Sequence, residues 1–155
     1  MESLAYRPIA DRDKREICTW HYAGEYGIYN LPPYEDMQER KMGFLNPEKE
    51  KNFYVFWNGE TLVGYVNLRE EENEVFIGIG VAPDLCGKGY GFGILQETYA
   101  LSRKLYPGKP LYLEVRSWNN RAIRCYEKAG FVMDGDSFVK ETPWGTAKFN
   151  RMIRK

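Results

Sequence analysis

An alternating run of glycines, Gly87, Gly89, Gly91 and Gly93, lies between an apolar segment and an amphipathic one. Residues 74–82 alternate β-branched residues with other types, which predicts a strand, and the segment after the glycines carries apolar residues at helical spacing. Backbone without Cβ atoms can approach a ligand closely, and amide N–H groups converge at the N-terminus of a helix. This junction predicts a binding site for a phosphate or pyrophosphate; a merely flexible turn is the alternative.

The glycine run does not fit the common nucleotide-binding motifs. Phe92 and Ile94 stand where the last glycine of Gly-x-Gly-x-x-Gly would fall, counted from Gly87 and Gly89 respectively. No lysine followed by serine or threonine completes a Walker motif. A dinucleotide or ATP site is therefore disfavoured.

The order of periodic segments and turn signals predicts one α/β domain over residues 1–155. A loop rich in glycine, proline and tyrosine at residues 24–33 separates the first two helices, and Asn58-Gly59 predicts a tight type I′ hairpin. The crossover within residues 74–117 is long enough to make its two strands parallel, whereas hairpins make the other pairs antiparallel. The expected strands are residues 4–9, 53–57, 62–68, 74–82, 111–117, 131–139 and 147–153. Four helices are expected. The first runs from Asp11 through His21, the second from the loop to Leu45, the third from the glycine run to Leu105, and the fourth from Asn119 to Gly130.

The charge balance and the cysteines restrict the classes of function. Lysine plus arginine and aspartate plus glutamate each number 22, so no global field would hold the chain on nucleic acid or an anionic membrane. Cys18, Cys86 and Cys125 lack the spacing of a metal site or a disulfide framework, which predicts free thiols and no metal. Because the chain has no apolar run near the ~20 residues of a membrane span and no signal-peptide core, we expect a cytoplasmic protein.

Two segments together resemble the GNAT superfamily of acyl-CoA-dependent N-acyltransferases. The loop signature of that family is Arg or Gln, two free positions, Gly, one free position, then Gly or Ala. Gly89 and Gly91 fill the glycine positions, and Cys86 stands where Arg or Gln is expected. Residues 119–131, Asn-Asn-Arg-Ala-Ile-Arg-Cys-Tyr-Glu-Lys-Ala-Gly-Phe, are similar to the family's Asn-x-x-Ala followed by Tyr-Glu-Lys-x-Gly-Phe.

The resemblance implies a single-domain, mixed, mostly antiparallel sheet with a central parallel strand pair splayed at a bulge, and helices on both faces. It also implies that acetyl-CoA is the co-substrate and that a main-chain N–H near Val81 polarises its thioester carbonyl. The residues themselves agree, since Gly78 and Gly80 leave one face of their strand bare for a pantetheine arm, unless they only relieve crowding. The expected cofactor-binding residues are Gly80, Val81, Cys86, Gly87, Lys88, Gly89, Tyr90, Gly91, Phe92, Gly93 and Asn119.

Glu114 and Tyr126 are the candidate base and acid. Glu114 lies in the middle of a strand expected to be central, where an unpaired charge is costly; an ion pair with Arg116 is the alternative explanation. Tyr126 lies on the apolar stripe of the following helix, so core packing is its alternative. In family members that acetylate protein N-termini, a Glu and a Tyr at the matching positions act as base and acid, and the resemblance implies these roles here.

The acceptor is expected to be a primary amine, either of a small molecule or of a peptide N-terminus, that attacks the thioester directly in a ternary complex. A Cys125 nucleophile is disfavoured because the only histidine, His21, is far away in sequence. A non-catalytic acyl-CoA sensor is the alternative outside the enzyme class, and a homodimer is left open. An aromatic and acidic wall would suit a cationic amine, and the expected substrate-binding residues are Trp20, Tyr22, Glu25, Tyr26 and Tyr29.

Overall fold

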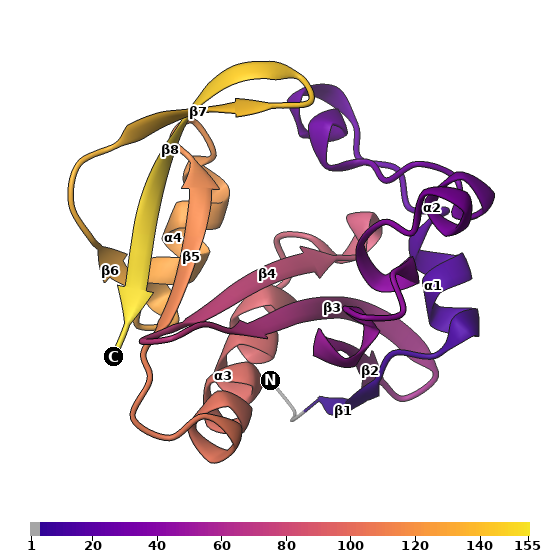
Figure 1. Ribbon diagram of the computed structural model, residues 1–155, viewed down its shortest axis with the longest axis horizontal. Helices are drawn as coiled ribbons and strands as arrows, with labels where there is room; N and C mark the ends of the chain where they lie inside the picture. Colours follow the sequence, from indigo (N-terminus) through magenta and orange to yellow (C-terminus); the bar gives the residue numbers. More distant parts are fainter. Residues whose placement is uncertain (1–3) are drawn as a thin grey trace.

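The computed structural model describes residues 4–155 and contains one mixed sheet in the order β1-β2-β3-β4-β5-β8-β6, with β7 also paired to β8 (Figure 1). Each pair is antiparallel except β4 and β5, which run parallel because a helix connects them. This arrangement confirms the expected mixed, mostly antiparallel sheet. The strands are β1 (Ala5–Pro8), β2 (Phe53–Asn58), β3 (Thr61–Glu70), β4 (Val75–Val81), β5 (Leu111–Arg116), β6 (Val132–Met133), β7 (Phe138–Thr142) and β8 (Gly145–Arg154).

The helices are short apart from α3, which carries the chain from β4 to β5. The side chain of Asn119 caps α4 by accepting a hydrogen bond of 3.2 Å from the N–H of Ala122, and Gly130 follows the helix with a φ of +97°. No helix in the described part of the chain is long and apolar enough to cross a membrane. The α-helices are α1 (Asp11–Ile17), α2 (Tyr34–Arg40), α3 (Tyr90–Leu105) and α4 (Asn120–Lys128), and the 3-10 helices are η1 (Gly24–Tyr29), η2 (Gly43–Leu45), η3 (Glu50–Asn52) and η4 (Pro83–Leu85).

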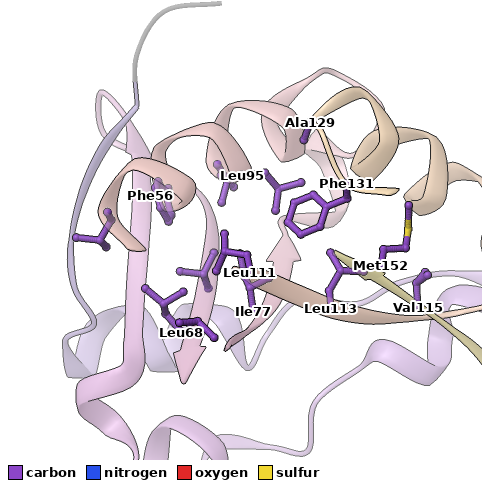
Figure 2. Packing of buried hydrophobic residues seen from close by; sticks show 14 of the residues in the cluster. Phe56, Leu68, Ile77, Leu95, Leu111, Leu113, Val115, Ala129, Phe131 and Met152 are labelled. Carbon is purple, nitrogen blue, oxygen red and sulfur yellow. The ribbon is translucent and has the colours of Figure 1, made fainter. Parts of the chain in front are cut away.

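The two faces of the sheet bury separate hydrophobic clusters. Alternate residues of β2 point to opposite faces, so Val55 joins the cluster formed with α1 and α2, whereas Phe56 joins the cluster formed with α3. Figure 2 shows the second cluster, in which Leu95 of α3 and Phe131 lie against apolar residues of β4, β5 and β8. The expectation of helices on both faces is therefore confirmed.

β4 and β5 pair over a short distance only. Their parallel register consists of Val75 with Leu111 and Phe76 with Tyr112, and the two strands then diverge (Figure 1). The antiparallel register between β3 and β4 continues along the whole of β4. A register shift lies instead between β2 and β3, where Val63 is the extra residue. The divergence leaves one edge of the second half of β4 unpaired.

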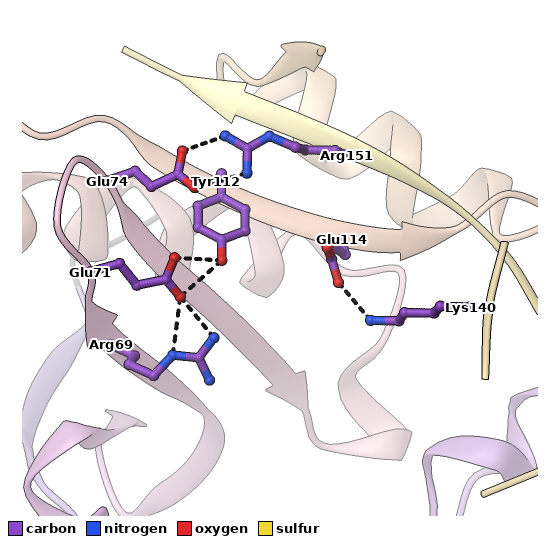
Figure 3. Close-up of polar contacts among 7 residues, drawn as sticks. All are labelled: Arg69, Glu71, Glu74, Tyr112, Glu114, Lys140 and Arg151. Atoms are coloured by element: carbon purple, nitrogen blue, oxygen red, sulfur yellow. Dashed lines mark hydrogen bonds and ion pairs between the residues drawn. The ribbon is translucent and has the colours of Figure 1, made fainter. Parts of the chain in front are cut away.

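Polar contacts close the end at which β4 and β5 still pair. The hydroxyl of Tyr112 lies 2.9 Å from both carboxylate oxygens of Glu71 and donates to that group, and Arg69 forms an ion pair with the same carboxylate (Figure 3). Arg151 of β8 forms an ion pair with Glu74 and lies over the Tyr112 ring. These contacts tie β3, β5 and β8 to the turn before β4, so the strands separate only toward the other end.

Two turns differ from the sequence-based expectations. Asn58 pairs with Thr61, so the β2–β3 turn consists of Gly59 and Glu60, and of these two only Gly59 has a positive φ. The type I′ turn expected at Asn58-Gly59 is therefore wrong, because it requires positive φ at both central residues. The strand expected at residues 131–139 is divided into β6 and β7, with Gly135 in a left-handed conformation between them.

The N-terminal helices are shorter than expected. The first ends at Ile17 instead of reaching His21, and the second ends at Arg40 because Lys41 takes a φ of +53°. The chain then continues to Leu45 as the separate η2. The segment expected as a loop at residues 24–33 contains η1, so part of it is helical.

Candidate active site

A cavity of about 650 Å³ occupies the gap between β4 and β5. Its wall includes the unpaired edge of β4, the middle of β5, the glycine loop with the start of α3, residues of α4 and the end of η1. This volume lies in the range typical of small-molecule sites. Within residues 4–155, no cluster of three or more His, Cys, Asp or Glu side chains could hold a metal ion.

The end of β4 presents main-chain groups to this cavity. The N–H of Ala82 donates to the carbonyl of Val63 in β3 at 2.9 Å. Hydrogen-bonded and non-hydrogen-bonded pairs alternate along an antiparallel ladder, so the preceding residue, Val81, forms a non-hydrogen-bonded pair with Gly64. The main-chain N–H and C=O of Val81 therefore point away from β3. The carbonyl and the N–H of Val81 therefore face the gap left by β5. The hydroxyl of Tyr22 donates a hydrogen bond of 2.6 Å to that carbonyl and holds the peptide group in place.

Tyr65 accounts for one of the two glycines of β4. A Cβ atom at Gly80 would collide with the ring of Tyr65, its cross-strand neighbour in β3. A Cβ atom at Gly78 would make only ordinary contacts, the nearest at 3.4 Å from the Phe76 ring. Burial raises the pKa of Tyr65 to about 12. The Tyr65 ring therefore explains why position 80 is a glycine. No neighbouring side chain excludes a Cβ atom at Gly78, which borders the cavity.

The glycine loop and the start of α3 form a site suited to an anion. Gly87 and Gly89 have φ values of +78° and +88°, which residues with side chains rarely adopt, and Gly89 is the N-cap of the helix. The first turn of α3 carries main-chain N–H groups without helical partners and the positive end of the helix dipole. Arg121 and Lys128 of α4 add positive charge to the cavity wall. These donors fit a phosphate or pyrophosphate.

The cavity brings together most of the expected cofactor-binding residues but not all of them. Lys88 is exposed and lies outside the cavity wall. The hydroxyl of Tyr90 accepts a hydrogen bond of 3.0 Å from the Asn58 side chain, and the N–H of Gly93 donates within α3. Those that line the cavity are Gly80, Val81, Cys86, Gly87, Gly89, Gly91, Phe92 and Asn119.

Both cysteines of the site are neutral thiols. The sulfur of Cys86 lies 3.8 Å from the carbonyl oxygen of Val81 and 3.6 Å from that of Ala82, so this side chain turns toward the end of β4. Cys125 lines the cavity where α3 and α4 meet, and a Cβ atom at Gly91 would lie 3.0 Å from its sulfur. Burial raises the pKa of both thiols, which keeps them protonated at neutral pH.

α4 carries Tyr126 into the cavity wall. The ring packs edge-on against Phe131 with centroids 6.3 Å apart, and burial raises the pKa of the hydroxyl well above its usual range. At the start of the same helix, Asn119 is 6% exposed and donates a hydrogen bond of 3.0 Å to the hydroxyl of Tyr29. This bond holds η1 against α4 at the cavity wall.

Glu114 lines the cavity from β5 and forms an ion pair with Lys140 of β7. Its Oε1 lies 2.6 Å from the lysine Nζ (Figure 3). The guanidinium of Arg116, the other partner considered for this carboxylate, lies instead over the ring of Phe149 at 5.1 Å. The Glu114 side chain is 28% exposed, so water still reaches it.

The expected acceptor wall is divided by the structure. Tyr22 and Tyr29 line the cavity, whereas Glu25 is exposed and outside its wall. Trp20 packs against Tyr65, with ring centroids 6.2 Å apart. Tyr26 lies between Trp118, at 5.6 Å, and the guanidinium of Arg121, at 4.0 Å, beside the cavity wall.

The cavity-lining residues that sequence reasoning missed include Tyr65, Arg121 and Lys128. A signal for the two cations was present, because residues 121, 122, 125, 126 and 128 recur at helical spacing and share a face of α4 with Tyr126. No local signal marked Tyr65, whose position follows from its pairing with Gly80.

Comparison with known proteins identifies the family to which the chain belongs. Residues 14–131 match the Acetyltransferase (GNAT) family. Because the match covers more than half of its length, the chain belongs to this family and is an N-acetyltransferase. The family's acetyl donor is acetyl-CoA.

Curated relatives carry N-acetyltransferase names. The chain is 27% identical to the uncharacterized N-acetyltransferase YfmK of Bacillus subtilis over 116 residues, which are 64% of this chain and 73% of the relative. It is 37% identical to the N-alpha-acetyltransferase RimI of Mycobacterium tuberculosis over 84 residues, half of each chain. It is 27% identical to the spermidine N(1)-acetyltransferase of Vibrio cholerae over 113 residues, 66% of this chain and 63% of the relative.

Solved structures share the whole fold. A chimera of the spermidine N-acetyltransferase SpeG from Vibrio cholerae and hSSAT superposes with a TM-score of 0.77 at 23% identity, covering 99% of this chain and 95% of the other. AAC(6′)-Ib in complex with ribostamycin and coenzyme A superposes with a TM-score of 0.74 at 22% identity, covering 99% and 94%. At these identities the likeness establishes the fold alone.

Proposed function

We propose that the chain transfers an acetyl group from acetyl-CoA to a primary amine by direct attack in a ternary complex. The observation that carries this proposal is the unpaired edge of β4, where the Val81 carbonyl is held by Tyr22 at 2.6 Å and the Val81 N–H faces the cavity. That N–H donates to the thioester oxygen and stabilises the negative charge that develops there. The same edge offers main-chain groups to the pantetheine amides, in the manner of an added strand.

The glycine loop holds the pyrophosphate of the donor. The N–H groups after Gly89 and the positively charged side chains of Arg121 and Lys128 are the donors for this anion. Cys86 supplies no charge, since its neutral thiol turns toward the end of β4. At Cys86, where the family has Arg or Gln, the side chain does not bind the pyrophosphate, and main-chain N–H groups of the loop bind it instead.

Glu114 and Tyr126 move the protons of the reaction. Glu114 accepts a proton from the substrate ammonium, and the neutral amine then attacks the thioester carbon. The new N–C bond forms and the C–S bond breaks. The nitrogen releases its second proton to solvent, the leaving thiolate receives the hydroxyl proton of Tyr126, and solvent returns a proton to Tyr126. The burial that raises the pKa of Tyr126 keeps this hydroxyl protonated and able to donate.

Direct attack is preferred to a covalent enzyme intermediate. Cys86 and Cys125 are the thiols in the cavity wall, but burial raises the pKa of both and reduces the thiolate that a nucleophile requires. His21, the only histidine, is exposed and does not line the cavity, so it does not activate either thiol.

The acceptor class has two candidates. The similarity to spermidine N-acetyltransferases favours a small cationic amine, which suits a wall containing Tyr22, Tyr29 and Glu114. The 37% identity to RimI favours a peptide N-terminus, in agreement with the Glu114 and Tyr126 pair that the family's N-terminal acetyltransferases use. Both candidates present a primary amine to the same carboxylate.

A thiol-release assay with acetyl-CoA tests the proposal. The acceptors are spermidine, an aminoglycoside, simple alkylamines and short peptides with free or blocked N-termini. We expect amine-dependent thiol release and an N-acetylated product with one class, and none with the blocked peptides. Binding of acetyl-CoA without release for any acceptor would indicate a sensor instead of an enzyme.

A further inference from the structure

Lys140 reaches across β8 to place its ammonium group on Glu114. Lys140 is paired with Ala147 of β8 and Glu114 with Arg151 of the same strand, so both side chains lie on one face of the sheet. Its Nζ lies 2.6 Å from Oε1 of Glu114 and 4.5 Å from the centroid of the Phe149 ring (Figure 3). A carboxylate together with an aromatic face is a combination that binds primary ammonium ions. The structure thus contains an ammonium site that is filled by one of the chain's own lysines.

This ammonium site opens on the donor cavity. Glu114 lines the cavity, and its carboxylate also faces Lys140. The ring of Phe149 lies on the same face of the sheet, because its cross-strand partner in β5 is Arg116, two positions from Glu114. An amine that reaches Glu114 from the cavity therefore meets a carboxylate that is already bound to the Lys140 ammonium group.

The lysine can leave this site at little cost. The side chains of Lys140 and Glu114 are 44% and 28% exposed, and ion pairs exposed to this degree contribute little to stability. The Phe149 ring already has the guanidinium of Arg116 at 5.1 Å. Lys140 and Arg116 already place two positive charges here, and they would repel a third. The ammonium group of a bound amine therefore replaces the Lys140 ammonium instead of binding beside it.

We propose that Lys140 holds the place of the acceptor's ammonium group, and that a cationic amine binds by displacing it from Glu114. The inference rests on the proposed function in one respect, namely that Glu114 faces the acceptor. Lys140 is then a specificity-determining residue that weakens the binding of primary ammonium compounds in general. The ligand class is a primary ammonium on an unbranched alkyl chain, the chemistry of the lysine side chain itself.

Butylammonium, which reproduces the whole lysine side chain from Cβ to the ammonium group, is the probe for this site. The full chain is saturated with coenzyme A, which lacks the acetyl group and permits no turnover, and the butylammonium Kd is measured by NMR titration. We expect Lys140→Ala to bind the probe up to about fivefold more tightly than the wild type, the scale of one exposed ion pair. The neutral isostere 1-butanol should show no such gain, because it cannot replace the ion pair.

Lys148→Ala is the matched control. Lys148 pairs with Val139 in the same hairpin, so its side chain lies on the opposite face of the sheet from Lys140. We expect it to bind butylammonium as the wild type does. We also expect Glu114→Gln in the Lys140→Ala background to abolish the gain.

The inference is overturned if Lys140→Ala binds butylammonium no more tightly than the wild type, or if Lys148→Ala shows the same gain. Both results are independent of catalysis. Tighter binding in Lys140→Ala without thiol release from any amine would support the ammonium site and contradict the proposed function. Thiol release with an unchanged Kd in Lys140→Ala would contradict the inference alone.

Discussion

The hydroxyl of Tyr22 donates a hydrogen bond of 2.6 Å to the carbonyl oxygen of Val81 and so connects the segment before η1 to the unpaired end of β4. The bond restrains the Val81–Ala82 peptide group, which directly follows the peptide group that carries the Val81 N–H and which no neighbouring strand holds on that side. Tyr22 is therefore a positioning residue for the donor that we assign to the thioester oxygen.

Removing this hydroxyl is expected to reduce turnover more than stability. Tyr22→Phe keeps the ring and loses one hydrogen bond, a net loss of about 1 kcal/mol or less in unfolding free energy. We expect kcat to fall about tenfold, which corresponds to ~1.4 kcal/mol of transition-state stabilisation, with KM for acetyl-CoA nearly unchanged. Tyr54→Phe in β2 is the control, with wild-type kcat expected; an equal fall in both variants would remove the special role of Tyr22.

Tyr126→Phe tests the general acid. The ring packing against Phe131 is preserved, so the melting temperature and the Kd for coenzyme A should match the wild type. Without the hydroxyl proton for the leaving thiolate, kcat should fall by ~10²-fold, the usual scale for one general acid. Tyr99→Phe is the control, because it removes a hydroxyl that donates to the carbonyl of Lys155, and it should keep the wild-type kcat. Unchanged turnover in Tyr126→Phe would mean that the residue only packs.

Glu114→Gln tests the general base. An amide cannot accept the amine proton, so kcat/KM should fall and the rise of activity with pH on the acid side of the profile should disappear. Glu70→Gln, which removes an ion pair with Lys109 outside the cavity, should keep the wild-type profile. If the Glu114→Gln profile kept its acid limb, the base would have to be another group or an ordered water.

Local sequence was sufficient for the parts of the site that a few adjacent residues determine. Asn119 occupies the helix-cap position that its residue type predicts, because a side-chain cap is decided within one turn of chain. The parallel pair between β4 and β5 followed from the length of the crossover between them.

Contacts between distant segments could not be predicted in this way. Glu114 pairs with Lys140 because the register of β8 against β5 and against β7 brings both side chains to the same face of the sheet. The residues next to Glu114 or Lys140 in the sequence do not determine this register, so the pair could not be predicted. Tyr65 lies against Gly80 for the same reason. Trp20 and Glu25 belong to an aromatic and acidic segment, but the path of η1 leaves them outside the cavity wall.

Gly89→Val tests the glycine loop. At a φ of +88°, a β-branched residue is strained and should cost roughly 1–3 kcal/mol of unfolding free energy. Acetyl-CoA at ~100 times its Kd should raise the melting temperature of the wild type by about 5–10 °C, and Gly89→Val should lose this shift. Gly108→Val, at a φ of +83° outside the site, should be destabilised similarly but keep the shift. A full shift in Gly89→Val would exclude the loop from the binding site.

Two-substrate kinetics test the central claim, that the acetyl group passes directly from donor to amine in a ternary complex. Initial rates of thiol release are measured over a matrix of acetyl-CoA and amine concentrations. Direct attack predicts double-reciprocal lines that intersect, because both substrates must be bound before the C–S bond breaks. Parallel lines, together with loss of activity in Cys125→Ala, would show that the acetyl group first resides on the enzyme and would contradict the account.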